Sequence, residues 1–541
     1  NKTVSVGTLA LADGSNGGLA ANYTLSGGTH QLTVNQRPLN ATLSRQYDGT
    51  TTAAGSTLSS FDALQGGETL TMTGSGTAAS ANVANGITMS SNGNLALANG
   101  TGTASNYSLN STVINIAKRV LTSSGSKTYD ANTNALAADI TLGNLVSGET
   151  LNHSGTATIG SANAGSYTIT NLSGISIADN AGSASNYTLT GGTHNFTVNR
   201  RVVGVSGTRL YDATTNAVAS DLSTHANLVG TQTLTLSGTG TIASKDVGSS
   251  KTVSVGTLAL GNGSNGGLAA NYTLTGGTHQ LTVNQRPLNA IIQRVYDGGL
   301  NANGSDLSSF DSLQGGETLF LSGTGTVSNK NVSSNQSVTL GTLALSDTGA
   351  TGETGNYSLN SAKLNIVQRP ISTVYLTKLY NASTTVQASD LQTMSNLVGS
   401  ETLTLTGTST ISDANVGVKT VNTGGFTLND QAGANASSGG LASNYILSGG
   451  THQLTINQRP LNATLARQYD GTTNAAGSDL SSFDALQGGE TLTLSGSGTA
   501  ADDNVANGIS VSSLGSLALV NGTGLASNYS LNSASLNITK R

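Results

Sequence analysis

The chain has no cysteine and no tryptophan, and only 49 of its 541 residues are charged (22 Lys and Arg, 27 Asp and Glu). Without cysteine it can form neither a disulfide framework nor a cysteine-ligated metal site. The net charge of −5 comes without any run of Lys or Arg, and binding to phosphate backbones needs such clusters, so nucleic acid is excluded as a partner. Simple disorder requires low hydrophobicity together with high net charge, so we expect the chain to fold.

Long apolar runs are also missing. They reach only about four or five residues, as around Ala290–Ile292, whereas a membrane-spanning helix needs roughly 18 or more. The opening residues Asn1–Ser5 place no apolar stretch behind a basic start, so they do not predict a signal peptide. We therefore expect no membrane insertion by this segment.

Two tyrosine positions recur along the chain with a domain-sized period. The first, Tyr followed by Asp or Asn, returns at spacings of 82, 82, 85, 84 and 89 residues, and the second lies in an Asn-Tyr pair 58 to 65 residues later. Each large ring can bury roughly 150–250 Å², so in a chain with few aromatics we interpret both positions as core anchors of every repeat. The first set is Tyr47, Tyr129, Tyr211, Tyr296, Tyr380 and Tyr469, and the second is Tyr107, Tyr187, Tyr272, Tyr357, Tyr445 and Tyr529.

A Gln-Arg, Lys-Arg or Arg-Arg pair recurs about once in every repeat length. Division of the chain after the second residue of this pair gives a partial repeat and six whole ones. All four prolines follow Gln-Arg at the start of a repeat, where proline removes a ladder donor and fixes φ, so they indicate semi-rigid joints. Almost no spacer lies between repeats, so neighbouring repeats of the chain are expected to abut. The divisions are 1–37 (partial), 38–119 (repeat 1), 120–201 (repeat 2), 202–286 (repeat 3), 287–369 (repeat 4), 370–459 (repeat 5) and 460–541 (repeat 6).

Within a repeat, apolar residues alternate with polar ones, as Leu70 and Met72 do with threonines, and clusters of Gly, Ser and Asn bound each run. This pattern predicts six or seven short antiparallel strands per repeat. The segment Asp306–Leu313 and its counterparts fit a short helix as well as a strand. We therefore predict an all-β tandem array of immunoglobulin-like β-sandwich repeats of about 84 residues forming an elongated rod, with β-grasp repeats as the alternative if the helix forms.

Groups suited to catalysis or metal binding do not converge. Four of the six histidines follow Gly-Gly-Thr, at most one in each repeat, whereas metal binding or general-base catalysis needs several groups together. Asp502 and Asp503 resemble a calcium site, but the matching Ala81 and Asn82 carry no carboxylate, so turn formation explains them better. We predict no enzymatic activity, no cofactor and no metal site. The four histidines are His30, His194, His279 and His452.

The Asn-Tyr pairs also form glycosylation sequons in most repeats. Asn444-Tyr445-Ile446 keeps the pair but loses the sequon, as expected if packing and turn geometry are what the position requires. We therefore interpret the asparagine as structural.

Four short motifs keep their order and spacing in the repeats: Tyr47–Thr51, Gly67–Leu70, Ser75–Thr77 and Asn106–Leu109. Together they resemble the YDG-type repeats, often found with MBG repeats, of large bacterial exoproteins. The resemblance covers the whole chain and implies a segment of a filamentous-haemagglutinin-like adhesin, exported by two-partner secretion and placed on the bacterial cell surface or in the biofilm matrix.

The motifs also depart from the pattern. Asn381 replaces the Asp after the first tyrosine, and Gln232 stands where other repeats have Glu. Groups that vary between copies are not expected to be catalytic.

Two functions remain open. The array is either a structural stalk that supports attachment and biofilm formation, or a set of multivalent carbohydrate-binding repeats that recognise exopolysaccharide or host glycan. Partners under these hypotheses are neighbouring repeats, exopolysaccharide or other copies of the adhesin. The lack of Trp and the commitment of most tyrosines to repeat positions favour the stalk.

Overall fold

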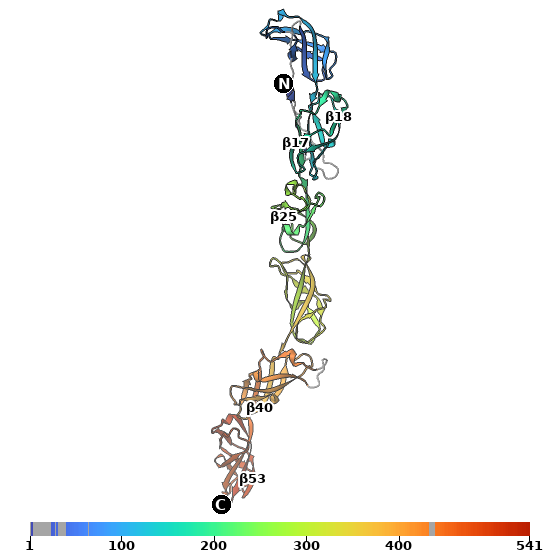
Figure 1. Ribbon diagram of the computed structural model, residues 1–541. Coiled ribbons are helices and arrows are strands. Elements are labelled where there is room, and N and C mark those ends of the chain that lie inside the picture. The colour runs from blue at the N-terminus through green and yellow to red at the C-terminus, as the bar shows by residue number, and fades with distance from the viewer. Residues whose placement is uncertain (1, 4–22, 27–28, 31–38, 63, 432–438) are drawn as a thin grey trace. The chain divides into compact units, whose positions relative to one another are not determined.

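The structure is a computed structural model that describes residues 2–3, 23–26, 29–30, 39–62, 64–431 and 439–541 (Figure 1). It divides into two compact units, Asn1–Asn284 and Gln285–Arg541, which we describe separately. The described residues form β-strands and short 3-10 turns, without an α-helix, and no helix in these ranges is long and apolar enough to cross a membrane. The predicted all-β class and the tandem repeats of about 84 residues are confirmed.

Repeat 1 shows the common architecture. A six-stranded sheet has the order β5-β8-β9-β11-β4-β6, and a two-stranded ribbon pairs β7 with β10. The first and last strands of the repeat, β4 and β11, are parallel neighbours inside the six-stranded sheet, with Leu43 opposite Ile114. The strands are β4 (Leu39–Gln46), β5 (Thr52–Ala54), β6 (Leu58–Phe61), β7 (Leu70–Thr73), β8 (Ser75–Ala78), β9 (Ala84–Ser91), β10 (Ala96–Asn99) and β11 (Leu109–Ala117).

The other repeats of the first unit follow the same plan. Three short strands precede repeat 1, namely β1 (Lys2–Thr3), β2 (Tyr23–Ser26) and β3 (Thr29–His30). Strand β2 pairs with β13 of repeat 2. Repeat 2 has β12 (Arg119–Val120), β13 (Thr122–Thr128), β14 (Asn134–Leu136), β15 (Ile140–Gly143), β16 (Leu151–Ile159), β17 (Gly165–Asn171), β18 (Ile175–Asp179), β19 (Tyr187–Thr188) and β20 (His194–Asn199). Repeat 3 has β21 (Arg201–Val202), β22 (Gly204–Leu210), β23 (Asn216–Val218), β24 (Thr224–Ala226), β25 (Leu234–Ser237), β26 (Thr239–Ile242), β27 (Gly248–Ser254), β28 (Ala259–Asn262), β29 (Tyr272–Thr273) and β30 (His279–Asn284).

The second unit keeps the central strands of this plan in three more repeats, with a four-stranded sheet in repeats 4 and 5 and a six-stranded sheet in repeat 6. Repeat 4 has β31 (Arg286–Val295), β32 (Asn301–Asn303), β33 (Leu307–Phe310), β34 (Phe320–Ser322), β35 (Thr324–Thr326), β36 (Ser333–Ser337), β37 (Ala344–Ser346) and β38 (Tyr357–Val367). Repeat 5 has β39 (Arg369–Pro370), β40 (Thr373–Leu379), β41 (Thr385–Gln387), β42 (Leu391–Ser395), β43 (Leu403–Thr410), β44 (Gly417–Thr420), β45 (Phe426–Asp430), β46 (Tyr445–Ile446) and β47 (Gln453–Asn457). Repeat 6 has β48 (Arg459–Gln468), β49 (Asn474–Ala476), β50 (Leu480–Phe483), β51 (Leu492–Ser495), β52 (Ser497–Ala500), β53 (Ala506–Ser513), β54 (Ala518–Asn521) and β55 (Tyr529–Thr539).

Alternation of side chains produces the core. Along β4 every second residue is buried, so Leu39, Ala41 and Leu43 face inward while the Asn and Thr between them face outward. The ribbon contributes Met72 to the same cluster, so sheet and ribbon form two layers around one core. The cluster does not stop at the end of the repeat, because Leu121 and Tyr187 of repeat 2 belong to it as well.

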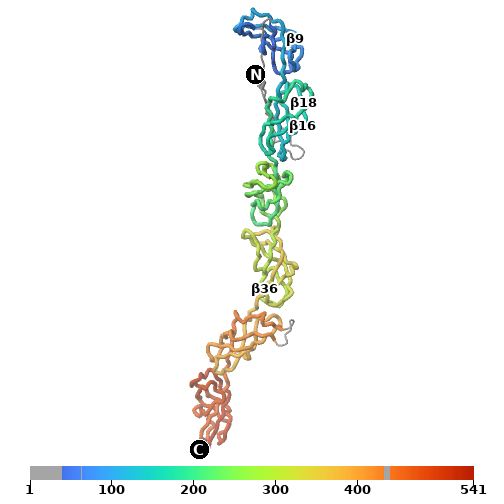
Figure 2. The backbone as a smooth tube through the Cα atoms, in the orientation of Figure 1, coloured from blue at the N-terminus to red at the C-terminus, as the bar shows by residue number. Residues whose placement is uncertain are grey.

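A glycine lets one strand serve both layers. In repeat 2, β16 runs unbroken from the ribbon, where it pairs with β18, into the sheet, where it pairs with β17. Figure 2 labels β16 and β18 in this repeat. It bends at Gly155, whose φ of +103° disfavours other residues. A Cβ at Gly155 would lie 1.9 Å from the carbonyl oxygen of Gly174, so no side chain fits at this bend.

The structure differs from the sequence pattern in the Asp306–Leu313 segment and in the direction of the central strands. The helix considered for Asp306–Leu313 does not form: Gly304–Asp306 make a 3-10 turn, and Leu307–Phe310 form β33, which pairs with β31. Apolar residues three apart in so short a segment fit a strand edge as well as a helix, and the hairpin supplies the backbone partners. The expectation of antiparallel strands throughout was wrong for the central pair, since β31 and β38 are parallel, as are β4 and β11.

Candidate functional site: the joint between successive repeats

The first tyrosine of a repeat is positioned by a tight turn. Tyr47 follows β4, and its N–H donates to the carbonyl of Ala117 at 2.9 Å. Asp48 then accepts the N–H of Thr50 at 2.9 Å and forms an ion pair with the buried Arg45. The turn requires an acceptor at the Asp position and not a negative charge.

Repeat 5 confirms that reading of the turn. Asn381 replaces the Asp, and its Oδ1 accepts the N–H of Ser383 at 3.1 Å. The variation between copies therefore has a structural cause.

The second tyrosine is fixed within its own repeat. Tyr187 follows the 3-10 turn η5 (Ala184–Asn186) and begins β19. Its hydroxyl donates to Oε2 of Glu149 at 2.6 Å and accepts the N–H of Val146 at 3.1 Å. The Glu of the Gly-Glu-Thr motif thus holds the tyrosine of the Asn-Tyr motif.

The same carboxylate also binds the preceding repeat. Tyr47 of repeat 1 donates to Oε1 of Glu149 at 2.5 Å, so two phenols from successive repeats meet on one carboxylate. The rings of Tyr47 and Tyr187 lie edge to face, with centroids 5.4 Å apart and planes at 80°. We call this arrangement the tyrosine–glutamate joint.

The joint recurs inside both units. Glu401 accepts from Tyr296 and Tyr445, and Glu490 accepts from Tyr380 and Tyr529.

Between repeats 2 and 3, Gln232 takes the place of the glutamate. Its Nε2 donates to the hydroxyl of Tyr129 at 2.9 Å, and its Oε1 accepts from Tyr272. The amide keeps both contacts by reversing one donor, so the departure from the Gly-Glu-Thr motif preserves the joint.

Burial and the carboxylate favour the neutral phenols. Desolvation, followed by the hydrogen bond to Glu149, raises the pKa of Tyr47 to about 12. The pKa values of Tyr187, Tyr296 and Tyr445 are raised above their ordinary range for the same reasons. The joint therefore keeps its phenolic protons throughout the physiological pH range.

An asparagine makes the second contact across the joint. Asn186 is 1% exposed; its Oδ1 accepts the N–H of Val83 at 2.8 Å, and its Nδ2 donates to Oδ1 of Asn82 at 2.9 Å, both in repeat 1. Asn271, Asn444 and Asn528 make the matching pair of bonds to the repeat before them. The side chains of these asparagines make their hydrogen bonds to the preceding repeat. This structural role explains why Asn444 is present where the sequon is lost.

An arginine at the boundary between two repeats makes the third contact in four joints. Arg119 donates from Nη1 to the carbonyl of Tyr47 at 3.2 Å, and from Nε and Nη2 to the carbonyl and side-chain oxygens of Asn144. Arg201, Arg369 and Arg459 bind the carbonyls of Tyr129, Tyr296 and Tyr380 in the same way.

The twelve tyrosines differ in burial. Tyr469, which meets no further repeat in the described chain, is 40% exposed, and Tyr107 of repeat 1 is half-buried with its hydroxyl 2.5 Å from Glu68. The other ten are 0–5% exposed: Tyr47, Tyr129, Tyr187, Tyr211, Tyr272, Tyr296, Tyr357, Tyr380, Tyr445 and Tyr529.

The sequence pattern places both tyrosines in the core of one repeat and does not indicate that tyrosines of different repeats meet. The same pattern does not indicate the role of Glu149, Asn186 or Arg119. One signal of the joint is present in the sequence. The Gly-Glu-Thr motif, the Asn-Tyr pair and the arginine at the repeat boundary recur together with the first tyrosine.

The model of the YDG domain matches residues 28–114, 117–194, 197–281, 278–364, 367–454 and 451–536. The chain belongs to the YDG domain family. A search of curated proteins finds no match.

In the parts that the structure describes, the His, Asp and Glu side chains of the YDG repeats do not gather into a metal site. No group of three or more His, Asp or Glu side chains could hold a metal ion there. His194, His279 and His452 are each 5% exposed and lie in different repeats. The side chain of His30 and the sequon at Asn22 lie outside the described residues.

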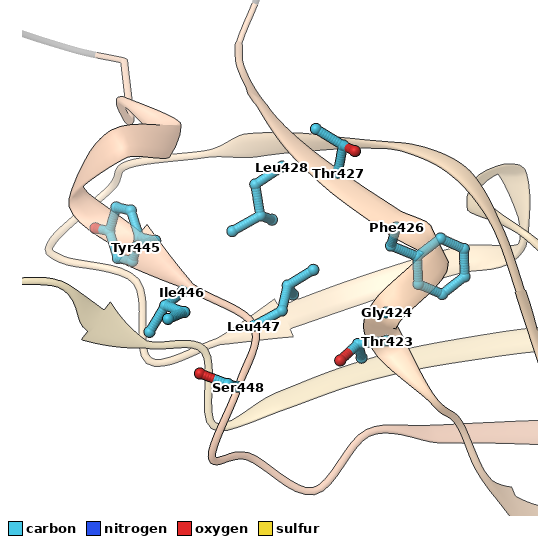
Figure 3. Close-up of a pocket in the computed structure, with 9 residues that line it drawn as sticks. All are labelled: Thr423, Gly424, Phe426, Thr427, Leu428, Tyr445, Ile446, Leu447 and Ser448. Carbon is cyan, nitrogen blue, oxygen red and sulfur yellow. The ribbon is translucent and has the colours of Figure 1, made fainter.

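Repeat 5 carries an open surface pocket of about 400 Å³ (Figure 3). Phe426 and Leu428 from β45 line it together with Leu447, while Thr423 and Ser448 supply hydroxyls. The pocket contains no charged side chain, and Phe426 itself is buried. It therefore lacks the exposed aromatic face that sugar sites use.

Proposed function

We propose that this YDG-repeat array is a structural stalk of a large secreted bacterial surface adhesin, in which it supports attachment between cells or to surfaces and the formation of biofilm. The observation that carries the proposal is the tyrosine–glutamate joint. Each joint combines one tyrosine from either repeat with a Glu or Gln, an Asn and an Arg, and the same contacts join repeats 1 to 2, 2 to 3, 4 to 5 and 5 to 6. Residues whose contacts join neighbouring repeats suit a protein that acts through its length.

The surface supports the same proposal. Among the described residues, the aromatic side chains that are 40% or more exposed are Phe320 and Tyr469, one in repeat 4 and one in repeat 6. Carbohydrate sites usually present exposed aromatic rings, so the repeats are poorly supplied for multivalent sugar binding. The extracellular location and two-partner secretion belong to the proposal and rest on the resemblance of the repeats to those of bacterial exoproteins.

Deletion of whole repeats tests the proposal. Removal of residues 120–286 takes out two repeats at equivalent boundaries and lets repeat 1 meet repeat 4. Adhesion of cells that carry the shortened protein should fall in a graded way, while the purified 541-residue segment should bind nothing on a glycan array. Saturable glycan binding by the purified segment would instead favour carbohydrate recognition by the repeats.

A further inference from the structure

The joint between repeats 2 and 3 differs from the other three joints inside the two units in its charge. Gln232 stands between Tyr129 and Tyr272, where the other joints have a glutamate. The packing is otherwise the same: the rings of Tyr129 and Tyr272 have centroids 5.3 Å apart and planes at 76°, against 5.4 Å and 80° for Tyr47 and Tyr187. The glutamine therefore changes the hydrogen bonds of the joint and leaves its ring contact in place.

A carboxylate suits two phenols better than a carboxamide does. Each phenol brings one proton, and a carboxylate has two oxygens that can accept them. Glu149 uses one oxygen for Tyr47 and the other for Tyr187. Gln232 has a single oxygen, and Tyr272 donates to it. Its nitrogen Nε2 only donates, so the hydroxyl of Tyr129 has to accept there.

The phenolic proton of Tyr129 is thereby left over. Among the described residues no acceptor receives it, because the hydrogen bond of this hydroxyl is the one that it accepts from Gln232. Tyr129 is 3% exposed, so solvent has little access to the proton. Reversing the amide of Gln232 would only move the deficit to Tyr272. One buried phenolic proton therefore lacks an acceptor in either orientation.

Charge strengthens the bonds of the glutamate joints. Hydrogen bonds to a carboxylate are shorter and about twice as strong as neutral ones. The hydroxyls of Tyr47 and Tyr187 lie 2.5 and 2.6 Å from the oxygens of Glu149, whereas the hydroxyl of Tyr129 lies 2.9 Å from Nε2 of Gln232. The joint between repeats 2 and 3 thus has two neutral bonds where its neighbour has two charge-assisted ones.

The arginine contact of this joint is also more open to water. Arg201 donates from Nε and Nη2 to the carbonyl and side-chain oxygens of Asn227 at 2.8 and 2.9 Å. Asn227 is exposed, whereas Asn144, which accepts from Arg119 in the joint between repeats 1 and 2, is 4% exposed. Hydrogen bonds are stronger where water and its high dielectric are excluded, so Arg201 stabilises its joint less than Arg119 does.

We propose that the joint between repeats 2 and 3 is a weak point built into the array, which opens before the three glutamate joints and lets the array yield there. In a stalk under tension every joint carries the same load, so the weakest joint opens first. The inference rests on the proposed stalk function for its biological meaning, whereas the weakness of the joint itself can be measured on the purified chain.

Each of these joints contains a backbone amide that reports its opening. The N–H of Ala164 in repeat 2 donates to Oδ1 of Asn271 in repeat 3 at 2.8 Å. Val83, Val332 and Val416 donate in the same way across the three glutamate joints. Such an amide exchanges with solvent when the asparagine of the next repeat withdraws, so its protection measures the opening of the joint.

Hydrogen exchange on the whole 541-residue chain tests the proposal, with protection factors for the four amides compared at one pH and temperature. The protection of Ala164 should be about 10-fold lower than that of Val83, Val332 and Val416, as expected when neutral bonds and an unpaired proton replace charge-assisted bonds. Equal protection of the four amides would overturn the proposal.

A reciprocal pair of variants shows whether the residue between the tyrosines decides the difference. Gln232→Glu should raise the protection of Ala164 about 10-fold and leave Val83 unchanged. Glu149→Gln should lower the protection of Val83 by a similar factor and leave Ala164 unchanged. An amide that does not respond to the exchange in its own joint would contradict the proposal.

These readouts are independent of adhesion, so failure of the stalk proposal and failure of this one are distinguishable. If one variant does not fold, the other variant and the comparison of amides within the unmodified chain still decide the question.

Discussion

The hydroxyl of Tyr47 donates to the carboxylate of Glu149, which lies 102 residues further along the chain and in the next repeat. Glu149 also accepts from Tyr187 of its own repeat, so one carboxylate joins two domains through two phenols. Hydrogen bonds to a charged acceptor are shorter and stronger than neutral ones, and here they are sheltered by packed rings. The joint thus resembles a piece of shared core more than a linker.

Removal of one phenolic oxygen should weaken the joint specifically. Tyr47→Phe keeps the ring contact with Tyr187 but leaves one oxygen of Glu149 without its donor. We expect a loss of about 1.5–3 kcal/mol in the free energy of unfolding of the two adjoining repeats. Tyr469→Phe is the matched control, because Tyr469 has the same place in its repeat but is 40% exposed. Denaturant titration with both variants decides the matter, and equal effects would show that the inter-repeat bond contributes nothing.

Replacement of the acceptor distinguishes the bond within a repeat from the bond between repeats. Glu149→Ala removes the partner of two phenols, whereas Glu68→Ala removes an acceptor that, among the described residues, binds the phenol of Tyr107 alone. Each unpaired buried phenol costs about 1–3 kcal/mol, so the first variant should lose more stability by roughly that amount. Calorimetry of the two variants provides the comparison. A smaller loss for Glu149→Ala would contradict the shared-acceptor arrangement.

Alkaline pH should open the joints. The pKa of Tyr47 is raised to about 12, above the roughly 10 of an exposed tyrosine. Its contribution to stability is therefore complete below about pH 10 and is lost as the pH rises from 10 towards 12. Phenolate absorbance and circular dichroism, recorded together, should show the buried tyrosines ionising as structure is lost. Ionisation of all tyrosines near pH 10, as a rough value, with the fold intact would contradict the assigned burial.

The buried Asn186 should contribute more to stability than the exposed Asn106 at the same motif position. Asn186→Ala would leave the N–H of Val83 without its acceptor, at a cost of about 1–3 kcal/mol. Asn106→Ala is the matched control, since Asn106 holds the same motif position but is exposed. Thermal unfolding should show a lower midpoint for the first variant only. Mass spectrometry of glycosylated material offers a second check, because sugar on Asn186 is incompatible with the buried joint.

The sequence predicted much of this fold because its signals are local. Alternation along Leu70–Thr73 and glycine-rich turns depend on near neighbours, and they recur with the 84-residue period, so they lead directly to all-β repeats. The parallel pairing of β4 with β11 joins segments about a repeat apart, and no short pattern encodes its direction. The joint was harder still, because Tyr47 and Glu149 act together from different repeats, while a tyrosine that recurs in every repeat fits the core of a single unit equally well.

The absence of cysteine permits a direct measurement of the central claim that the joint fixes successive repeats. Cysteines introduced at the exposed positions Ser60 and Thr170 of repeats 1 and 2 can carry spin labels for pulsed dipolar spectroscopy. The unmodified joint should give one narrow distance distribution, and Tyr47→Phe combined with Glu149→Ala should broaden it. A distribution that is already broad with the joint intact would contradict the account.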